Sequence, residues 1–147
     1  MVERLVANEK VVGSSPIARS KMPLEYCNII VNNFLMTDLA DKKCIPCEGG
    51  IPNFNITEIH KYLKMVDGWK VESDENKIYY LIKQFKFKNF KESQEFVNKV
   101  GEIAENEGHH PDVWFGWGYA KIKIYTHAIK GLHESDFILA AKVDKIN

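Results

Sequence analysis

The segment from Asn89 to Pro111 constrains the fold of this 147-residue chain more than any other feature of its sequence. Asn89 and Glu92 stand at the spacing of a capping box, which predicts the start of a helix. Gly108 and Pro111 follow the apolar stripe and predict its end. The stripe consists of Phe96, Val97, Val100, Ile103 and Ala104. Because a helix with one apolar side has to bury that side, the rest of the chain must supply a surface for it to cover.

Two hairpin patterns, one before this helix and one after it, predict that surface. Residues 69–90 contain two strand-like runs around the acidic and amide-rich turn SDEN. In the second run only Lys83 interrupts an alternating apolar side formed by Tyr79, Leu81, Phe85 and Phe87. The later hairpin joins strands over about 113–116 and 119–126. Its second strand has an apolar side of Ala120, Ile122 and Ile124 and a polar side of Lys121, Lys123 and Tyr125.

Two further helices complete the pattern. Thr57 is expected to cap a short helix that stops at Gly68 and carries Ile59, Tyr62, Leu63 and Val66. The last helix starts near residues 133–135, has Glu134 and Asp136 in its first turn, and carries Phe137, Ile138, Ala140, Ala141 and Val143. The order α-β-β-α-β-β-α predicts an α+β, two-layer domain, in which a four-stranded antiparallel sheet has its helices packed on one face.

The N-terminal residues do not fit this pattern. Residues 1–35 show no sustained periodicity, and we expect them to form a poorly structured extension to a domain that spans residues 36–147. The segment GSSP at residues 13–16 can be encoded by the kind of nucleotide sequence found in the T-arm of tRNA genes. We therefore expect that translation truly begins further downstream, at Met22 or Met36.

Composition excludes several classes of function. Twenty basic and twenty acidic residues cancel, so no global charge draws the chain to nucleic acid or to a membrane surface. No run approaches the roughly 18 consecutive apolar residues of a membrane helix. Glu3 and Glu9 interrupt any secretory pattern at the start. Three cysteines, an odd number, do not form a disulfide framework, so a cytoplasmic location is expected.

Three histidines around the second hairpin are the candidate catalytic residues. His109 and His110 stand just past the end of the long helix, and a hairpin would return His127 to their side. Imidazole gives and takes a proton near neutrality, so converging imidazoles indicate proton transfer or metal ligation. From the pattern alone, a purely structural role for all three remains the alternative. His60 and His133 are interpreted as surface or capping residues.

Other motifs carry weaker signals. Cys44 and Cys47 form a single CxxC, but a second pair is missing and no βαβ context surrounds them, so structural thiols are favoured. No carboxylate or thiolate stands at an established ligand spacing from the histidines, so no metal site is predicted. Phe115 is assigned to packing, whereas Trp114 and Trp117 are candidates for ligand or subunit contacts.

Read in order, several of these residues form a longer pattern of an acid, His-His-Pro, an aromatic residue, a histidine and an acid. Its members are Glu105, His109, His110, Pro111, Trp117, His127 and Asp136. Together with the segments CIPCEGG, FKFKNF and FGWGYAKIKIYTHAIKGLHESDF, this pattern resembles the bacterial type of the pterin-4a-carbinolamine dehydratase family, also called 4a-hydroxytetrahydrobiopterin dehydratase. The resemblance extends from about Met36 to the C-terminus.

The resemblance implies a hydro-lyase. Such enzymes remove water from the 4a-carbinolamine that remains when an aromatic amino acid hydroxylase has used its tetrahydropterin, and they release quinonoid dihydropterin without any cofactor. It also implies that His109, His110 and His127 are catalytic, with the acid and base roles open among them and His110 the most damaging loss. A homodimer or homotetramer and a functional link to phenylalanine hydroxylase are expected on the same grounds.

The remaining members of the pattern have less defined roles. Glu105, Pro111 and Trp117 are expected to bind or orient the pterin substrate, although Glu105 fits a solvated helix end equally well. Asp136 is expected to serve the N-terminus of the last helix more than the chemistry. Two other functions stay open: a binding module, because animal relatives double as dimerisation cofactors of a transcription factor, and a metal-dependent hydrolase that uses the same histidines.

Overall fold

The computed structural model describes residues 38–45 and 51–146. The predicted N-terminal extension, residues 1–35, lies outside the described residues together with both candidate start positions, and so does Cys47. Within the described ranges, no helix combines the length and the apolar character needed to cross a bilayer.

The order of the described elements confirms the predicted α+β class. Three α-helices and four strands follow one another as α2 (Ile56–Leu63), β1 (Lys70–Ser73), β2 (Tyr79–Lys86), α3 (Phe90–Glu107), β3 (Asp112–Gly116), β4 (Tyr119–Ile124) and α4 (Glu134–Asp144). Two short 3-10 helices, η1 (Leu39–Asp41) and η2 (His127–Ile129), were not expected from the sequence.

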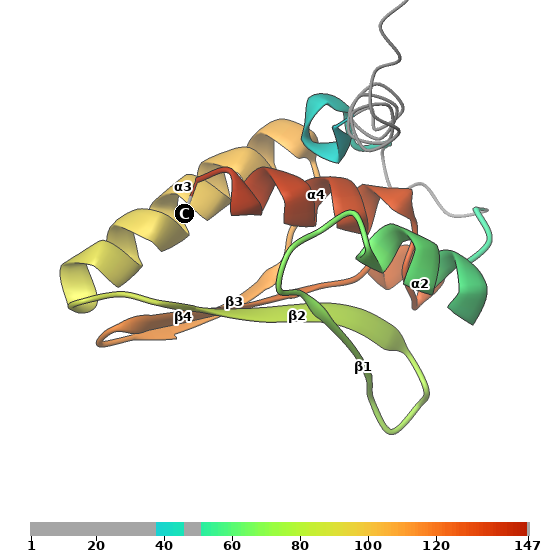
Figure 1. The fold of residues 1–147 in the computed structure, drawn as a ribbon, viewed down its shortest axis with the longest axis horizontal. Helices are drawn as coiled ribbons and strands as arrows, with labels where there is room; N and C mark the ends of the chain where they lie inside the picture. Colours follow the sequence, from blue (N-terminus) through green and yellow to red (C-terminus); the bar gives the residue numbers. More distant parts are fainter. Residues whose placement is uncertain (1–37, 46–50, 147) are drawn as a thin grey trace, which may run out of the picture. The chain divides into compact units, whose positions relative to one another are not determined.

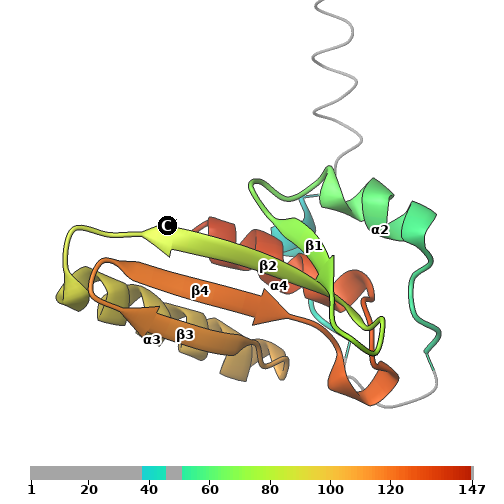
Figure 2. The same cartoon turned by 90° about the horizontal axis from the view of Figure 1, so that it is seen from below.

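The four strands form one antiparallel sheet in the order β1-β2-β4-β3. Helices α2, α3 and α4 lie on the same side of it (Figure 1), and Figure 2 shows the strands from the uncovered side. Across β2 and β4, Leu81 pairs with Ile124 and Phe85 pairs with Ala120, and all four side chains are buried. The core therefore lies between one face of the sheet and the helices, as the alternation predicts.

Lys83, which interrupts the alternation on β2, is accommodated by a carboxylate from the last helix. Its Nζ forms an ion pair with Asp144 Oδ1 at 2.7 Å and donates a hydrogen bond to the Asp67 carbonyl at 2.6 Å. The indole N–H of Trp69 donates to the same carboxylate at 3.0 Å. A charged residue is tolerated there because it is paired. Tyr79, predicted on the apolar side, is instead 39% exposed.

The prediction that Thr57 caps the first helix is wrong, because Asn55 forms a complete capping box. Asn55 Oδ1 accepts hydrogen bonds from the backbone N–H groups of Thr57 at 2.9 Å and Glu58 at 3.1 Å. Glu58 Oε2 in turn accepts from the Asn55 N–H at 2.8 Å. An asparagine and a glutamate at this spacing outcompete a threonine inside the first turn. The helix also ends earlier than predicted, at Leu63 rather than close to Gly68.

Helix α3 starts and ends where the sequence predicts. Asn89 Oδ1 accepts a hydrogen bond from the Glu92 N–H at 2.9 Å, and Gly108 follows the helix in the left-handed conformation, with φ of 62°. The backbone N–H of His109 donates to the Ala104 carbonyl at 3.1 Å, and that of Gly108 donates to the Glu105 carbonyl at 3.2 Å. These bonds close a Schellman-type end, which fixes the backbone of His109 against the helix.

Replacing Gly108 with alanine is expected to lower the free energy of unfolding by about 1 kcal/mol, because an L side chain is strained at this φ. Gly101→Ala is the matched control, since Gly101 lies in the middle of α3 with no atom within 4 Å of an added Cβ. It is expected to raise the free energy of unfolding by about 0.5 to 1 kcal/mol. Urea unfolding followed by circular dichroism measures both, and equal effects of the two changes would contradict the assigned helix end.

The segment that contains η1 is fastened to the ends of α3 and α4. Glu107 Oε2 accepts a hydrogen bond from the Cys44 N–H at 2.8 Å, and Glu107 also forms an ion pair with Lys142. Burial by itself would raise the pKa of Glu107, but these two partners lower it below its ordinary value. Ser135 adds a hydrogen bond from its hydroxyl to the Ile45 carbonyl. The first turn of α4 is thereby tied to the segment that contains η1.

Candidate active site

The three candidate histidines come from two places in the chain, the end of α3 and the start of η2, and share one cavity. His109 and His110 follow α3, and His127 opens η2 after β4. Asp112 pairs with Lys123 across the antiparallel strands β3 and β4, so the chain entering β3 lies beside the chain leaving β4. The cavity has a volume of about 210 Å³. Its lining consists of Gly108, His109, His110, Tyr125, Thr126, His127 and Ala128.

His109 is a buried imidazole paired with a buried carboxylate. Its side chain is 4% exposed and that of Asp136 is 0% exposed, and His109 Nε2 lies 2.8 Å from Asp136 Oδ1. Asp136 also accepts a hydrogen bond from the Thr126 hydroxyl, 3.0 Å from Oδ2, and one from the His133 backbone N–H at 2.7 Å. The bond to His133 caps α4, as expected of Asp136, but the bonds to His109 and Thr126 were not predicted.

The environment of Asp136 selects a tautomer of His109. A carboxylate that already accepts hydrogen bonds from Thr126 and His133 acts as an acceptor toward the ring as well. Nε2 of His109 therefore acts as the donor in this pair, and the carboxylate fixes the orientation of the ring.

His110 is paired with a carboxylate too, but in an exposed setting. Its Nε2 lies 2.9 Å from Glu105 Oε1, and both side chains are largely exposed to solvent. An exposed pair of this kind contributes roughly 0 to 1 kcal/mol to folding, so its effect lies in the orientation of the ring rather than in stability. Pro111 follows at the start of the turn into β3, where it prevents the helix from continuing.

His127 also lines the cavity, and it packs against an aromatic ring. The centroids of the His127 and Tyr125 rings are 4.2 Å apart. Burial, and then the nearby carboxylates of Asp112 and Asp74, raise the pKa of Tyr125 above its ordinary value. The phenol of Tyr125, a residue that also lines the cavity, is therefore neutral at physiological pH.

Trp117 is not brought to this cavity. It lies at the tip of the β3–β4 hairpin, whereas the histidines lie at the other end of these strands, and it is 74% exposed. Trp114 is exposed as well, with the Lys121 ammonium 5.8 Å from its ring centroid. Phe115 packs on Phe90 at a centroid distance of 5.6 Å, which supports its assignment to packing, although 39% of it remains exposed.

Cys44 has the environment of a structural thiol. It is buried, and its Sγ lies 3.5 Å from the Ser135 carbonyl oxygen. Burial, followed by the proximity of Glu107, raises the pKa of Cys44 to about 12, so the thiol stays protonated and is a poor nucleophile. Among the described residues, no group of three or more potential metal ligands converges closely enough to hold an ion.

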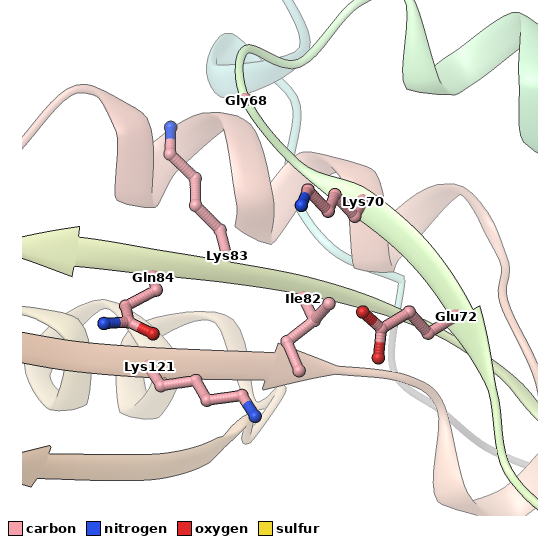
Figure 3. A pocket seen from close by; sticks show the side chains of 7 residues that line it. All are labelled: Gly68, Lys70, Glu72, Ile82, Lys83, Gln84 and Lys121. Atoms are coloured by element: carbon pink, nitrogen blue, oxygen red, sulfur yellow. The ribbon is translucent and has the colours of Figure 1, made fainter.

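A second hollow, of about 330 Å³, opens between β1, β2 and β4. Figure 3 shows that Lys83 points from this hollow toward α4, while Ile82 and Lys121 point to the other side of the sheet. Its lining consists of Gly68, Lys70, Glu72, Ile82, Lys83, Gln84 and Lys121. None of these side chains is a histidine, so this hollow contains none of the candidate catalytic residues.

Comparison with known proteins identifies the family of the chain. The family model described as pterin 4 alpha carbinolamine dehydratase matches residues 52–146. A protein of Rubrobacter xylanophilus that carries this enzyme name is 47% identical over 111 residues, which cover 76% of this chain and 100% of the relative. Another, from Alkaliphilus metalliredigens, is 50% identical over 111 residues, covering 75% of this chain and 96% of the relative.

A solved structure shows the same fold. The crystal structure of a transcriptional coactivator/pterin dehydratase from Brucella melitensis superposes with a TM-score of 0.57 and 26% sequence identity, covering 64% of this chain and 97% of that one. The match of the family model and the high identity to full-length relatives establish the assignment. The chain therefore belongs to the pterin-4a-carbinolamine dehydratase family, whose members are hydro-lyases.

Proposed function

We propose that this chain removes water from a 4a-hydroxytetrahydropterin, the 4a-carbinolamine, to give the quinonoid dihydropterin. The observation that carries the proposal is the single cavity lined by three imidazoles, two of which have a carboxylate partner. Membership of the family supplies the substrate class.

Loss of water from this substrate needs two proton transfers. An acid protonates the C4a hydroxyl, the C4a–O bond breaks and water leaves. The electron pair of N5 forms the C4a=N5 double bond, and a base takes the N5 proton. Imidazolium suits the first role and neutral imidazole the second, and each such group contributes about 10²- to 10⁴-fold to a rate.

The carboxylate partners suit these roles in different ways. Asp136 and Glu105 each lie within hydrogen-bond distance of the imidazole they contact and fix the orientation of its ring. His109 is buried and rigidly held, whereas His110 is exposed and can exchange its proton with solvent between turnovers. We propose His109, His110 and His127 as the catalytic set, leave the acid and base roles open among them, and expect His110 to be the most sensitive position.

The remaining proposals concern the other members of the family pattern, the assembly of the protein and its location. Glu105 and Pro111 are proposed to orient His110, and Trp117, which lies outside the cavity, is left out of the proposed site. A homodimer or homotetramer, a cytoplasmic location and a functional link to phenylalanine hydroxylase rest on the family resemblance alone. The proposed reaction requires no cofactor.

The direct test follows the decay of a chemically generated 4a-hydroxytetrahydropterin by ultraviolet absorbance. The protein at catalytic concentration is expected to accelerate the decay above that in buffer, with equal rates before and after treatment with a chelator. Loss of activity on chelation, with recovery on adding metal back, would favour the metal-dependent hydrolase. A decay rate equal to that in buffer would refute the proposal and favour the binding module.

A further inference from the structure

The hydroxyl of Thr126 is in a position to control His109 through the carboxylate of Asp136. It donates to both carboxylate oxygens of Asp136, at 3.0 and 3.2 Å, and Asp136 Oδ1 is the atom that contacts His109 Nε2. All three side chains are buried, so water does not compete for these bonds. Thr126 and Asp136 are ten positions apart and come from different elements, so the carboxylate is oriented from outside its own helix.

Thr126 is itself held rigidly. Its backbone N–H donates to the Gly131 carbonyl at 2.9 Å, and its carbonyl accepts from the Gly131 N–H at 3.4 Å. Position 131 requires a glycine, because an added Cβ there would lie 2.8 Å from the Asn53 side chain. A donor fixed in this way restricts the rotation of the Asp136 carboxylate and, through it, the plane and tautomer of the His109 ring.

We propose that Thr126 is a positioning residue of the dehydration reaction, which sets the orientation and tautomer of His109 through Asp136. The proposal rests on the dehydratase function proposed above. It predicts that Thr126→Val, which keeps the shape but removes the donor, lowers kcat about 10- to 100-fold and leaves KM within about twofold. Thr126→Ser, which restores the donor, is expected to recover kcat to within about threefold of wild type.

The matched control is Thr57→Val, the same change at an exposed position on α2, and it is expected to leave kcat unchanged. A readout independent of activity is the pair of ¹⁵N shifts of the His109 ring. Thr126→Val is expected to shift them toward a mixture of tautomers, while the ring signals of His127 stay in place. Wild-type rate and wild-type His109 shifts in Thr126→Val would overturn the proposal.

The two proposals fail in distinguishable ways. If the wild-type protein does not accelerate dehydration, the dehydratase function fails, and the His109 shifts of Thr126→Val alone decide whether Thr126 positions the ring. Should Thr126→Val not fold, the wild-type protein still provides the test. Its Thr126 hydroxyl proton is expected to exchange slowly with solvent and to show a nuclear Overhauser effect to the His109 ring, and a fast-exchanging hydroxyl would overturn the proposal.

Discussion

Asp136→Ala is expected to lower the free energy of unfolding by about 3 to 5 kcal/mol, the largest effect on stability that this site predicts. The change removes the acceptor that three donors share: the buried Thr126 hydroxyl, the buried His109 ring and the half-buried His133 N–H. Each unsatisfied buried group costs about 1 to 3 kcal/mol. Since small domains are stable by only about 5 to 15 kcal/mol, a large share of the total is lost.

Urea unfolding monitored by circular dichroism measures this effect, with Asp112→Ala as the matched control. Asp112 pairs with Lys123 at 3.9 Å on a partly exposed strand, so its loss is expected to change stability by less than about 1 kcal/mol. Equal losses for the two aspartates would contradict the network around Asp136.

His110→Ala is expected to cause a large loss of rate with little loss of stability. Its imidazole is exposed and makes one exposed contact, with Glu105, so the free energy of unfolding is expected to change by no more than about 0.5 kcal/mol. The dehydration rate is expected to fall by about 10²- to 10³-fold, because one proton-transfer group is removed from the cavity.

The ultraviolet decay assay measures this loss. His60→Ala is the control, since His60 is an exposed histidine on α2 outside the cavity, and its rate should match wild type. A His110→Ala protein that keeps the wild-type rate would remove His110 from the catalytic set. The assignments of His109 and His127 would then have to be tested with variants of those two residues.

Local signals account for most of the fold that could be predicted from the sequence. Asn89, Glu92 and Gly108 specify α3 through bonds within a few residues of one another, and the structure has the helix at that place. Lys83 could be recognised only as an irregularity, because its partner Asp144 comes from α4 at the other end of the chain. The cap of α2 was misassigned because Asn55 and Thr57 are both good capping residues, and the glutamate at position 58 decides between them.

The site shows the same division between local and distant information. The convergence of His109, His110 and His127 follows from a hairpin that the alternating pattern predicts. The contacts of Asp136 with His109 and Thr126 span 27 and 10 positions, so they depend on how α4 packs against the sheet. The one sequence signal for Asp136 is its place as the last member of the family pattern.

Trp117 is a member of the family pattern that the fold places away from the cavity. Trp117 fits the family pattern by spacing, yet the hairpin carries it to the end opposite the cavity. The spacing of residues along a strand determines which face of the sheet each residue occupies. It does not determine at which end of the sheet the other residues of the pattern lie. Pattern and position therefore have to agree before a residue is assigned to a site.

The central claim is that a pterin binds among the imidazoles of His109, His110 and His127. Titration of the ¹⁵N-labelled protein with a stable pterin, 7,8-dihydrobiopterin, tests it through the ring signals of all five histidines. The account predicts that the signals of these three histidines move together along one saturation curve, while those of His60 and His133, which do not line the cavity, stay in place. Movement of His60 or His133 alone, or no movement at saturating pterin, would contradict it.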